Sequence, residues 1–344
     1  MNNQIKSTSN DTWFFGHPKG MVTLFFTEMW ERMSFYGMRA LLVLYMTAAV
    51  DSTFNPGMGL SSEAAQAIYG IYVGMVYFMV IPGGWLADNI LGHQKAVLIG
   101  AIIIAMGHIT LAIPLSETFF LGLALVVIGT GLLKGNISTI VGKLYKEGDT
   151  RIQAGYTIFY MSINIGSALG FLVVAWLGEK IGWHWGFGAA GIGMIFGVMQ
   201  YIFFKRLLGE AANQPNAMPV AQRNGYLKWS KITAAFMVIV LGLGLSGYIT
   251  IDAEVFAENF AIFLTVVAFI YFSYLFLFAG LSKAEKKNLF LLLILFIGAV
   301  AFWSGFDQSG SSLSLFAKEF TDLNVLGYEI CLLYTSDAAD ELLG

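Results

Sequence analysis

The chain has few charged residues: Asp, Glu, Lys and Arg together make up 12% of its 344 residues. Soluble domains carry about 25%, so this shortage argues against an ordinary soluble protein. The net charge of −3 gives no reason to expect a nucleic-acid partner. A single cysteine, Cys331, excludes a disulfide framework. The four histidines lack metal-ligand spacing, and no Ser/His/Asp arrangement suits hydrolysis, so we expect no metal, no cofactor and no enzyme activity.

The chain is rich in long apolar runs. Hydrophobic residues make up 57% of it, and the mean hydropathy is +0.70. The runs that are long enough to cross about 30 Å of hydrocarbon cover 21–50, 65–87, 95–115, 118–144, 153–178, 186–205, 229–250, 259–281 and 288–317. A tenth would begin near 326. The sequence therefore predicts an all-α integral membrane protein whose surroundings are a lipid bilayer.

The polar stretch 206–228 predicts a cytoplasmic linker after a first module of six helices, 21–205, which follows a polar tail over 1–20. The end of the chain is different in kind. Residues 331–344 are too polar and too short to span a membrane, and Cys331 to Glu341 back-translates onto an adapter used in preparing sequencing libraries. We expect natural sequence to end near Ile330 and 331–344 to be a non-native tail.

The distribution of Lys and Arg predicts the orientation. If the N-terminus is cytoplasmic, the outer loops hold only Lys180 and Lys318, and the spans hold Arg32, Arg39 and Lys134. All other Lys and Arg residues then fall on the cytoplasmic side, as the positive-inside rule requires.

The first span carries five side chains that a lipid-facing helix should lack. At 100° per residue they share one side of a helix: Glu28, Glu31, Arg32, Tyr36 and Arg39. Each charge costs at least ~2.5 kcal/mol at the bilayer centre. These groups must therefore face a polar interior, and that side of the helix is a candidate functional site.

Two more charges lie at membrane depth, Lys134 in the fourth span and Asp307 in the ninth. With them, three acids match three bases. Such a balance suits a water-filled cavity with switchable ion pairs, because unpaired charge there is costly. The alternative is that the charges only hold helices together, which hydrogen-bonded amides would do at lower cost.

Several motifs resemble one known family. The segment PGGWLADNILGHQK, 82–95, resembles the loop motif of the major facilitator superfamily. Residues 28–37, EMWERMSFYG, resemble the ExxERFxYYG signature of the proton-dependent oligopeptide transporter family. FYMSINIG, 159–166, resembles its second signature, FYxxINxG, and the ninth span resembles its FWxxxEQxGSSL segment with Asp307 in place of Glu. The resemblance covers 13–330.

That resemblance implies the major facilitator superfamily fold. Bacterial members have two six-helix bundles with two extra helices between them, so 229–281 would hold the extra helices and 288–330 the start of the C-terminal bundle. It further implies proton-coupled symport of di- and tripeptides by alternating access, with protons as the coupling ion. The expected location is the bacterial inner membrane, with a monomeric functional unit.

A zwitterionic peptide needs a fixed cation, a fixed anion and adaptable walls. Arg39 and Lys134 are our candidates for its carboxylate. Asn164 suits the peptide backbone or amino end, and Tyr36, Tyr77 and Trp303 suit the walls. Asp307 would take up the coupling proton once substrate occupies its cationic partner. Glu28, Glu31 and Arg32 would form a second proton site.

Two other readings stay open. One is proton symport of another small solute, such as nitrate or a sugar, on the same fold. The other is an inactive, truncated fragment of a transporter.

Overall fold

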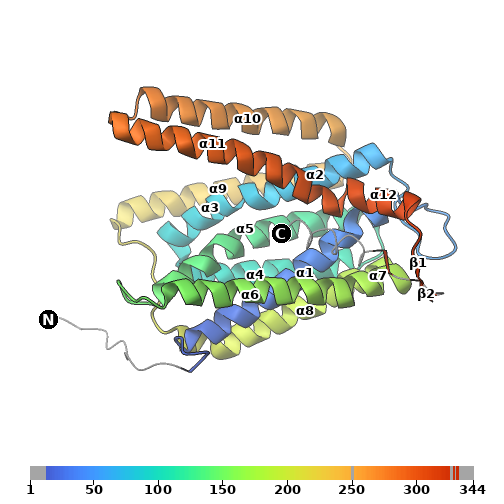
Figure 1. The fold of residues 1–344 in the computed structure, drawn as a ribbon, viewed down its shortest axis with the longest axis horizontal. Helices are drawn as coiled ribbons and strands as arrows, with labels where there is room; N and C mark the ends of the chain where they lie inside the picture. Colours follow the sequence, from blue (N-terminus) through green and yellow to red (C-terminus); the bar gives the residue numbers. More distant parts are fainter. Residues whose placement is uncertain (1–12, 249–251, 326–327, 330, 333–344) are drawn as a thin grey trace. The chain divides into compact units, whose positions relative to one another are not determined.

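The computed structural model describes residues 13–248, 252–325, 328–329, 331 and 332, and the chain there is almost entirely helical (Figure 1). The α-helices are α1 (Gly20–Thr47), α2 (Ser62–Phe78), α3 (Val80–Leu86), α4 (His93–Leu111), α5 (Ser116–Lys143), α6 (Ile152–Leu169), α7 (Trp176–Lys180), α8 (Trp183–Phe204), α9 (Val220–Leu245), α10 (Ala253–Leu277), α11 (Lys283–Phe306) and α12 (Ser312–Phe320). Short π and 3-10 segments are η1 (Ala87–Leu91), η2 (Gly170–Ala175), η3 (Lys205–Leu208) and η4 (Asp307–Gly310). Two antiparallel strands of two residues each, β1 (Asn324–Val325) and β2 (Tyr328–Glu329), come last.

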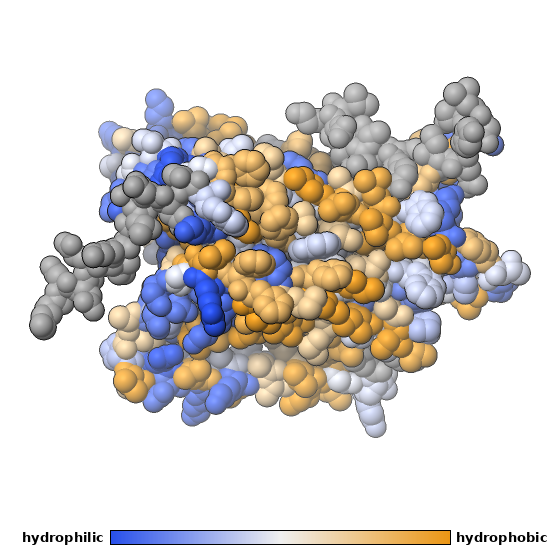
Figure 2. All heavy atoms as spheres, turned by 90° about the horizontal axis from the view of Figure 1, so that it is seen from below, coloured by the Kyte–Doolittle hydropathy of each residue, from blue (hydrophilic) through white to orange (hydrophobic). Residues whose placement is uncertain are grey.

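The all-α membrane fold predicted from the sequence is confirmed. Among the described residues, eight helical segments are long and apolar enough to cross a membrane. α1 is also long enough, but it carries the four charged side chains noted above. On the face drawn in Figure 2, apolar side chains form a broad band, with polar side chains gathered toward its ends. The predicted tail 1–20 and non-native tail 331–344 lie mostly outside the described residues.

Several predicted spans differ from the observed helices, and two of the differences have a clear cause. α9 begins at Val220, nine residues before the predicted start at 229, because Pro219 caps a polar helical turn that precedes the apolar run. The ninth span is interrupted: α11 ends at Phe306, and η4 separates it from α12. Hydropathy predicts an unbroken run over 288–317 because it averages over the Asp307–Gly310 break.

Contacts divide the chain into two compact units, and the division falls within both α1 and α2. Unit 1 comprises Met1–Met38 and Gly74–Ile249; unit 2 comprises Arg39–Val73 and Thr250–Gly344. The predicted arrangement of a six-helix bundle, a linker, two extra helices and a second bundle is a division along the sequence, and it stays a prediction. Part of the predicted linker is packed in unit 1, where the Gln94 amide donates to the carbonyls of Gly209 at 2.9 Å and Ala211 at 2.7 Å.

Glycines bring α4 and α5 of unit 1 into close contact. A Cβ added to Gly100 would lie 2.6 Å from the Gly129 carbonyl oxygen, and one added to Gly122 would lie 2.9 Å from that of Gly107. Only glycine fits at such distances, as is common between membrane helices. Around this contact, α1, α4, α5 and α8 contribute the buried residues of the core, among them Leu24, Ile104, Leu133, Ile137 and Tyr201.

The segment before α1 is attached to the connection between α5 and α6. His17 Nδ1 lies 2.8 Å from the Tyr145 hydroxyl, and Arg151 donates to the Gly16 carbonyl at 3.1 Å. Arg151 also bonds Asp149, with Nη2–Oδ2 at 2.7 Å. Burial lowers the pKa of His17 below its ordinary value of 6.5, and the charge of Arg151 lowers it further. The neutral imidazole is therefore the form that this attachment favours.

Replacing His17 by Gln is expected to reduce the loss of thermal stability on acidification. In the unfolded chain His17 binds a proton below about pH 6.5. In the folded chain the lowered pKa means that His17 binds a proton only at a lower pH. The stabilisation is thus complete above about pH 6.5 and is lost as the pH falls toward the lower, folded pKa. Hydrogen bonds to Arg151 lower the pKa of Asp149 to about 2, so Asp149 does not titrate in this range.

The measurement is the melting temperature of the chain in detergent from pH 7 to about 5. The control is His184→Gln, at the start of α8. Its melting temperature should fall on acidification as much as that of the unmodified chain. An equal fall in the His17→Gln protein would contradict the assignment.

Candidate functional site

The carboxylates of Glu28 and Glu31 both bind Arg32 inside unit 1. Glu28 and Arg32 are one helical turn apart in α1, and their Oε1 and Nε atoms are 3.1 Å apart. Arg32 Nε also bonds Glu31 Oε2. All three side chains are at most 4% exposed. The pairing predicted from the sequence is confirmed; its role in proton handling stays a prediction.

This cluster keeps unused hydrogen-bonding atoms. Among the described residues, Glu28 Oε2, Glu31 Oε1 and one terminal nitrogen of Arg32 have no hydrogen-bond partner. A proton added to either carboxylate oxygen would therefore leave the bonds to Arg32 in place. Such a site can gain or lose a proton without being dismantled.

Lys134 of α5 is held against aromatic rings of the same unit. Its Nζ lies 4.0 Å from the ring centre of Tyr77 and 6.0 Å from that of Phe35. The guanidinium of Arg32 lies 5.1 Å from the Phe35 ring and 5.9 Å from the Tyr36 ring. Ring faces stabilise cations where water is scarce. Unit 1 thus gathers two carboxylates, two cations and three aromatic rings.

In unit 2, Arg39 binds Asp307. Arg39 Nη2 lies 2.7 Å from Asp307 Oδ1, and the side chains are 7% and 26% exposed. The sequence predicts an ion pair of Asp307 with Arg39 or Lys134, and the pair with Arg39 is confirmed. Asp307 is thus the more accessible member of the pair.

The interruption of the ninth span supplies further contacts for Arg39. In a continuous helix the Asp307 carbonyl would accept from the Ser311 amide, but that amide donates to Gln308 at 3.0 Å. The Asp307 carbonyl instead accepts from the Tyr69 hydroxyl at 3.3 Å and from Arg39 Nη2 at 3.4 Å. Arg39 Nε donates to the Tyr69 hydroxyl, and the guanidinium lies 5.5 Å from that ring.

Sequence reasoning missed Tyr69, which is 3% exposed in α2. A lone tyrosine in an apolar helix has no spacing that distinguishes it from a packing residue. The glycine at position 310 is the one sequence feature that relates to Tyr69. A Cβ added to Gly310 would collide with the Tyr69 hydroxyl. Tyr69 orients Arg39 and fixes the interruption at Asp307.

If Arg39 binds a peptide carboxylate, as the family resemblance implies, changing Tyr69 to Phe is expected to weaken dialanine binding by about tenfold. Arg39 would lose a hydrogen bond that orients it, and a hydrogen bond to a charged group contributes at least about 1.5 kcal/mol. The ring would still face the guanidinium, so the fold should be kept. Equilibrium binding of labelled dialanine is the measurement, and Tyr271→Phe, on the exposed face of α10, is the control. Unchanged affinity in Tyr69→Phe would show that the hydroxyl does not position Arg39.

Two predicted site residues are not joined to these charges by any described hydrogen bond or ion pair. Asn164 is exposed on α6. Trp303 is 47% exposed on α11, one turn before Asp307, and its described contacts are with the rings of Phe302 and Phe306 at 5.5 and 5.1 Å. Their proposed roles stay predictions.

A second missed set lies near the predicted cytoplasmic end of unit 1. His93 Nε2 is 3.2 Å from Asp88 Oδ1, and its Nδ1 is 2.8 Å from Asn136 Oδ1. Asn136 in turn donates to the Leu132 carbonyl at 2.8 Å. This set links η1 and the first residue of α4 to the part of α5 that carries Lys134.

Comparison with known proteins places the chain in a family. Residues 94–331 match the POT family, PTR2, and the chain belongs to that family. It is 43% identical over 326 residues to the peptide transporter YePEPT of Yersinia enterocolitica subsp. palearctica, a match that covers 92% of this chain and 63% of that protein. It is 38% identical over 318 residues to a di-/tripeptide transporter of Lactococcus lactis subsp. lactis, covering 90% and 63%.

The fold agrees with this membership. A crystal structure of a mutant of peptide transporter POT, in complex with alafosfalin, matches with a TM-score of 0.85 and 38% identity over 95% of this chain and 66% of that one. The chain is thus a multi-pass membrane protein with the major facilitator type of fold. It spans less than two thirds of the length of the curated relatives above.

Proposed function

We propose that the protein to which this chain belongs carries di- and tripeptides into the cytoplasm together with protons, by alternating access. The single observation that carries the proposal is the Arg39–Asp307 pair, at 2.7 Å, in an interrupted membrane helix. A substrate carboxylate can replace Asp307 on Arg39 because both are oxyanions that a guanidinium binds. Asp307 then loses its cation, and taking up a proton becomes favourable.

The other site residues support the same substrate class. Lys134 offers a second cation for the peptide carboxylate, and Asn164 offers a donor and an acceptor for the backbone or amino end. Tyr36, Tyr77 and Trp303 provide walls that tolerate different side chains. Relatives named peptide and di-/tripeptide transporters, and the POT structure that holds alafosfalin, support this assignment.

The proton path would include the buried cluster in α1. Glu28 and Glu31 share Arg32, so a proton on either carboxyl would still leave the other carboxylate paired with the guanidinium. The bacterial inner membrane, a cytoplasmic N-terminus and a monomeric functional unit complete the proposal. Lys and Arg on the predicted cytoplasmic side support that orientation.

The test is uptake of labelled dialanine into proteoliposomes under an inward proton gradient. Because the chain spans 63% of the Yersinia relative, it would be compared with a version extended after residue 330 by the C-terminal part of that relative, here called the extended chain. Uptake by the extended chain that trialanine inhibits and nitrate or glucose does not would support the proposal. Inhibition by nitrate or glucose alone would overturn the substrate class.

Replacing Lys134 by Ala is expected to weaken dialanine binding by about tenfold or more, because one charge-assisted hydrogen bond to the carboxylate is lost. Binding to the extended chain is measured by isothermal titration. Lys146→Ala, in the exposed connection between α5 and α6, removes the same charge away from the site and should bind normally. Near-normal affinity in Lys134→Ala would remove this residue from the site.

A further inference from the structure

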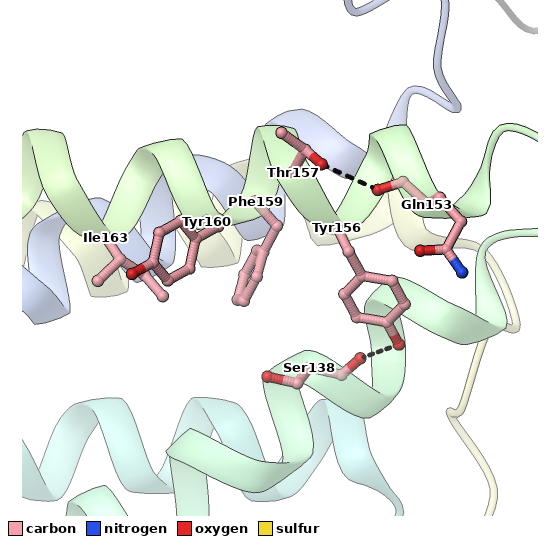
Figure 3. Close-up of a pocket in the computed structure, with 7 residues that line it drawn as sticks. All are labelled: Ser138, Gln153, Tyr156, Thr157, Phe159, Tyr160 and Ile163. Atoms are coloured by element: carbon pink, nitrogen blue, oxygen red, sulfur yellow. Dashed lines mark hydrogen bonds between the residues drawn. The ribbon is translucent and has the colours of Figure 1, made fainter. Parts of the chain in front are cut away.

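A groove of about 460 Å³ lies in unit 1 between α5 and α6, apart from the charged groups described above (Figure 3). Figure 3 shows the Tyr156 side chain of α6 directed toward Ser138 of α5, and the Thr157 side chain directed away from it. The lining residues are Ser138, Gln153, Tyr156, Thr157, Phe159, Tyr160 and Ile163. Its volume is within the range of about 300–1,000 Å³ that small-molecule sites occupy.

The lining of the groove is mostly apolar and carries a few uncharged polar groups. The Tyr156 hydroxyl donates to the Ser138 carbonyl at 3.2 Å, and the Thr157 hydroxyl donates to the Gln153 carbonyl at 3.2 Å. The Gln153 and Tyr160 side chains are exposed. A carboxamide and phenols can hydrogen-bond a peptide unit, and Phe159 and Ile163 add apolar surface beside them. No charged side chain lines the groove.

Part of the groove lining shares a face of α6 with a predicted substrate residue, Asn164. Gln153, Thr157, Tyr160 and Asn164 follow one another at intervals of four, three and four residues, so they share one face of α6. All four are exposed. At 1.5 Å per residue this face runs about 16 Å, from the Lys- and Arg-containing connection before α6 to Asn164.

We propose that this groove is a second, weaker peptide subsite between Asn164 and the cytoplasmic end of α6. It would take the backbone of a di- or tripeptide with a small or apolar side chain. Because the groove has no cation for the carboxylate, a peptide there gives up its strongest contact, so binding is weak enough for release. The inference rests on the proposed function and adds a site to it.

The experiment measures protection of a thiol in the groove. In the extended chain, with any cysteine of its added part replaced by Ser, Gln153→Cys places a single thiol on the lining, and Met161→Cys places one on an exposed position of α6 outside it. Maleimide labelling of each is followed with and without trialanine. At ten times the dissociation constant of the groove, labelling at 153 should slow about tenfold, and labelling at 161 should not change.

Adding Arg39→Ala separates the groove from the charged site. Two concentrations are then compared with those measured before Arg39 was replaced. The trialanine concentration that half-protects the thiol at 153 should rise only a little, because it reports the groove. The concentration for half-maximal binding of labelled trialanine should rise more, because it reports the charged site. Equal rises would mean that 153 is shielded only by a movement triggered at the charged site, which would overturn the subsite. Slow labelling at 153 in every detergent and lipid, unaffected by trialanine, would mean that an acyl chain fills the groove, and would also overturn it.

Failure of the proposed function gives a different result. If the extended chain binds no labelled trialanine at all, the proposed peptide transport fails, and the subsite fails with it. If the chain binds trialanine while labelling at 153 and 161 stays equal, the proposed function stands and only the groove is wrong.

Discussion

Replacing Arg39 by Ala is expected to weaken dialanine binding by about 10- to 100-fold, since a guanidinium–carboxylate contact contributes about 1.5–3 kcal/mol. Arg39 is buried, and Tyr69 and the carbonyl of Asp307 hold its guanidinium in place. A side chain fixed in this way loses little freedom when substrate arrives. Its removal therefore takes away a prepared contact and leaves Asp307 without its described cationic partner.

The measurement is isothermal titration of the extended chain with dialanine, together with its melting temperature. Arg39→Lys is the matched control for charge: it keeps the cation but cannot bind a carboxylate through two nitrogens, so an intermediate loss is expected. An unfolded Arg39→Ala protein would show in the melting curve. Normal affinity in a folded Arg39→Ala protein would count against Arg39 as the substrate anchor.

Replacing Asp307 by Asn is expected to abolish proton-driven accumulation of dialanine while leaving exchange across the membrane intact. The asparagine carbonyl can still accept from Arg39 Nη2, as Asp307 Oδ1 does at 2.7 Å. The amide cannot bind and release a proton near neutral pH. The proton gradient therefore cannot drive uptake through this residue. Peptide would still equilibrate through alternating access.

Two proteoliposome assays separate these outcomes. Counterflow, in which labelled dialanine exchanges for unlabelled dialanine, needs no gradient and should continue. Uptake above the outside concentration under an inward proton gradient should stop. Glu258→Gln, an exposed change in α10, removes an acid of the same unit and should leave both assays unchanged. Continued accumulation in Asp307→Asn would assign the coupling proton to another group. Glu28 and Glu31 would then be the remaining candidates.

The ion pairs could be predicted because charge in a membrane must be balanced nearby. The spacing of Glu28 and Arg32 places them on adjacent turns of one helix, and the structure joins them at 3.1 Å. Arg39 and Asp307 are far apart in sequence, yet each needs an opposite charge, which limits the possible partners. Three acids and three bases left few alternatives.

The interruption of the ninth span could not be predicted from hydropathy. Averaging over 288–317 hides the four residues of η4, although Asp307 and Gly310 are weak helix formers. Tyr69 was missed for a related reason: its function depends on a carbonyl that is free only because the helix is broken there. A residue whose partner is a backbone group at a distortion leaves no mark in the sequence pattern.

The glycine contacts between α4 and α5 have a mechanical consequence. Backbones that approach at Gly100–Gly129 and Gly107–Gly122 leave no room for one helix to slip along the other, because the next side chains in register would meet main-chain oxygens. The two helices can therefore move only together. A displacement of α5 would therefore be shared by α4, which begins at His93, and so by Asp88 of η1, which pairs with His93.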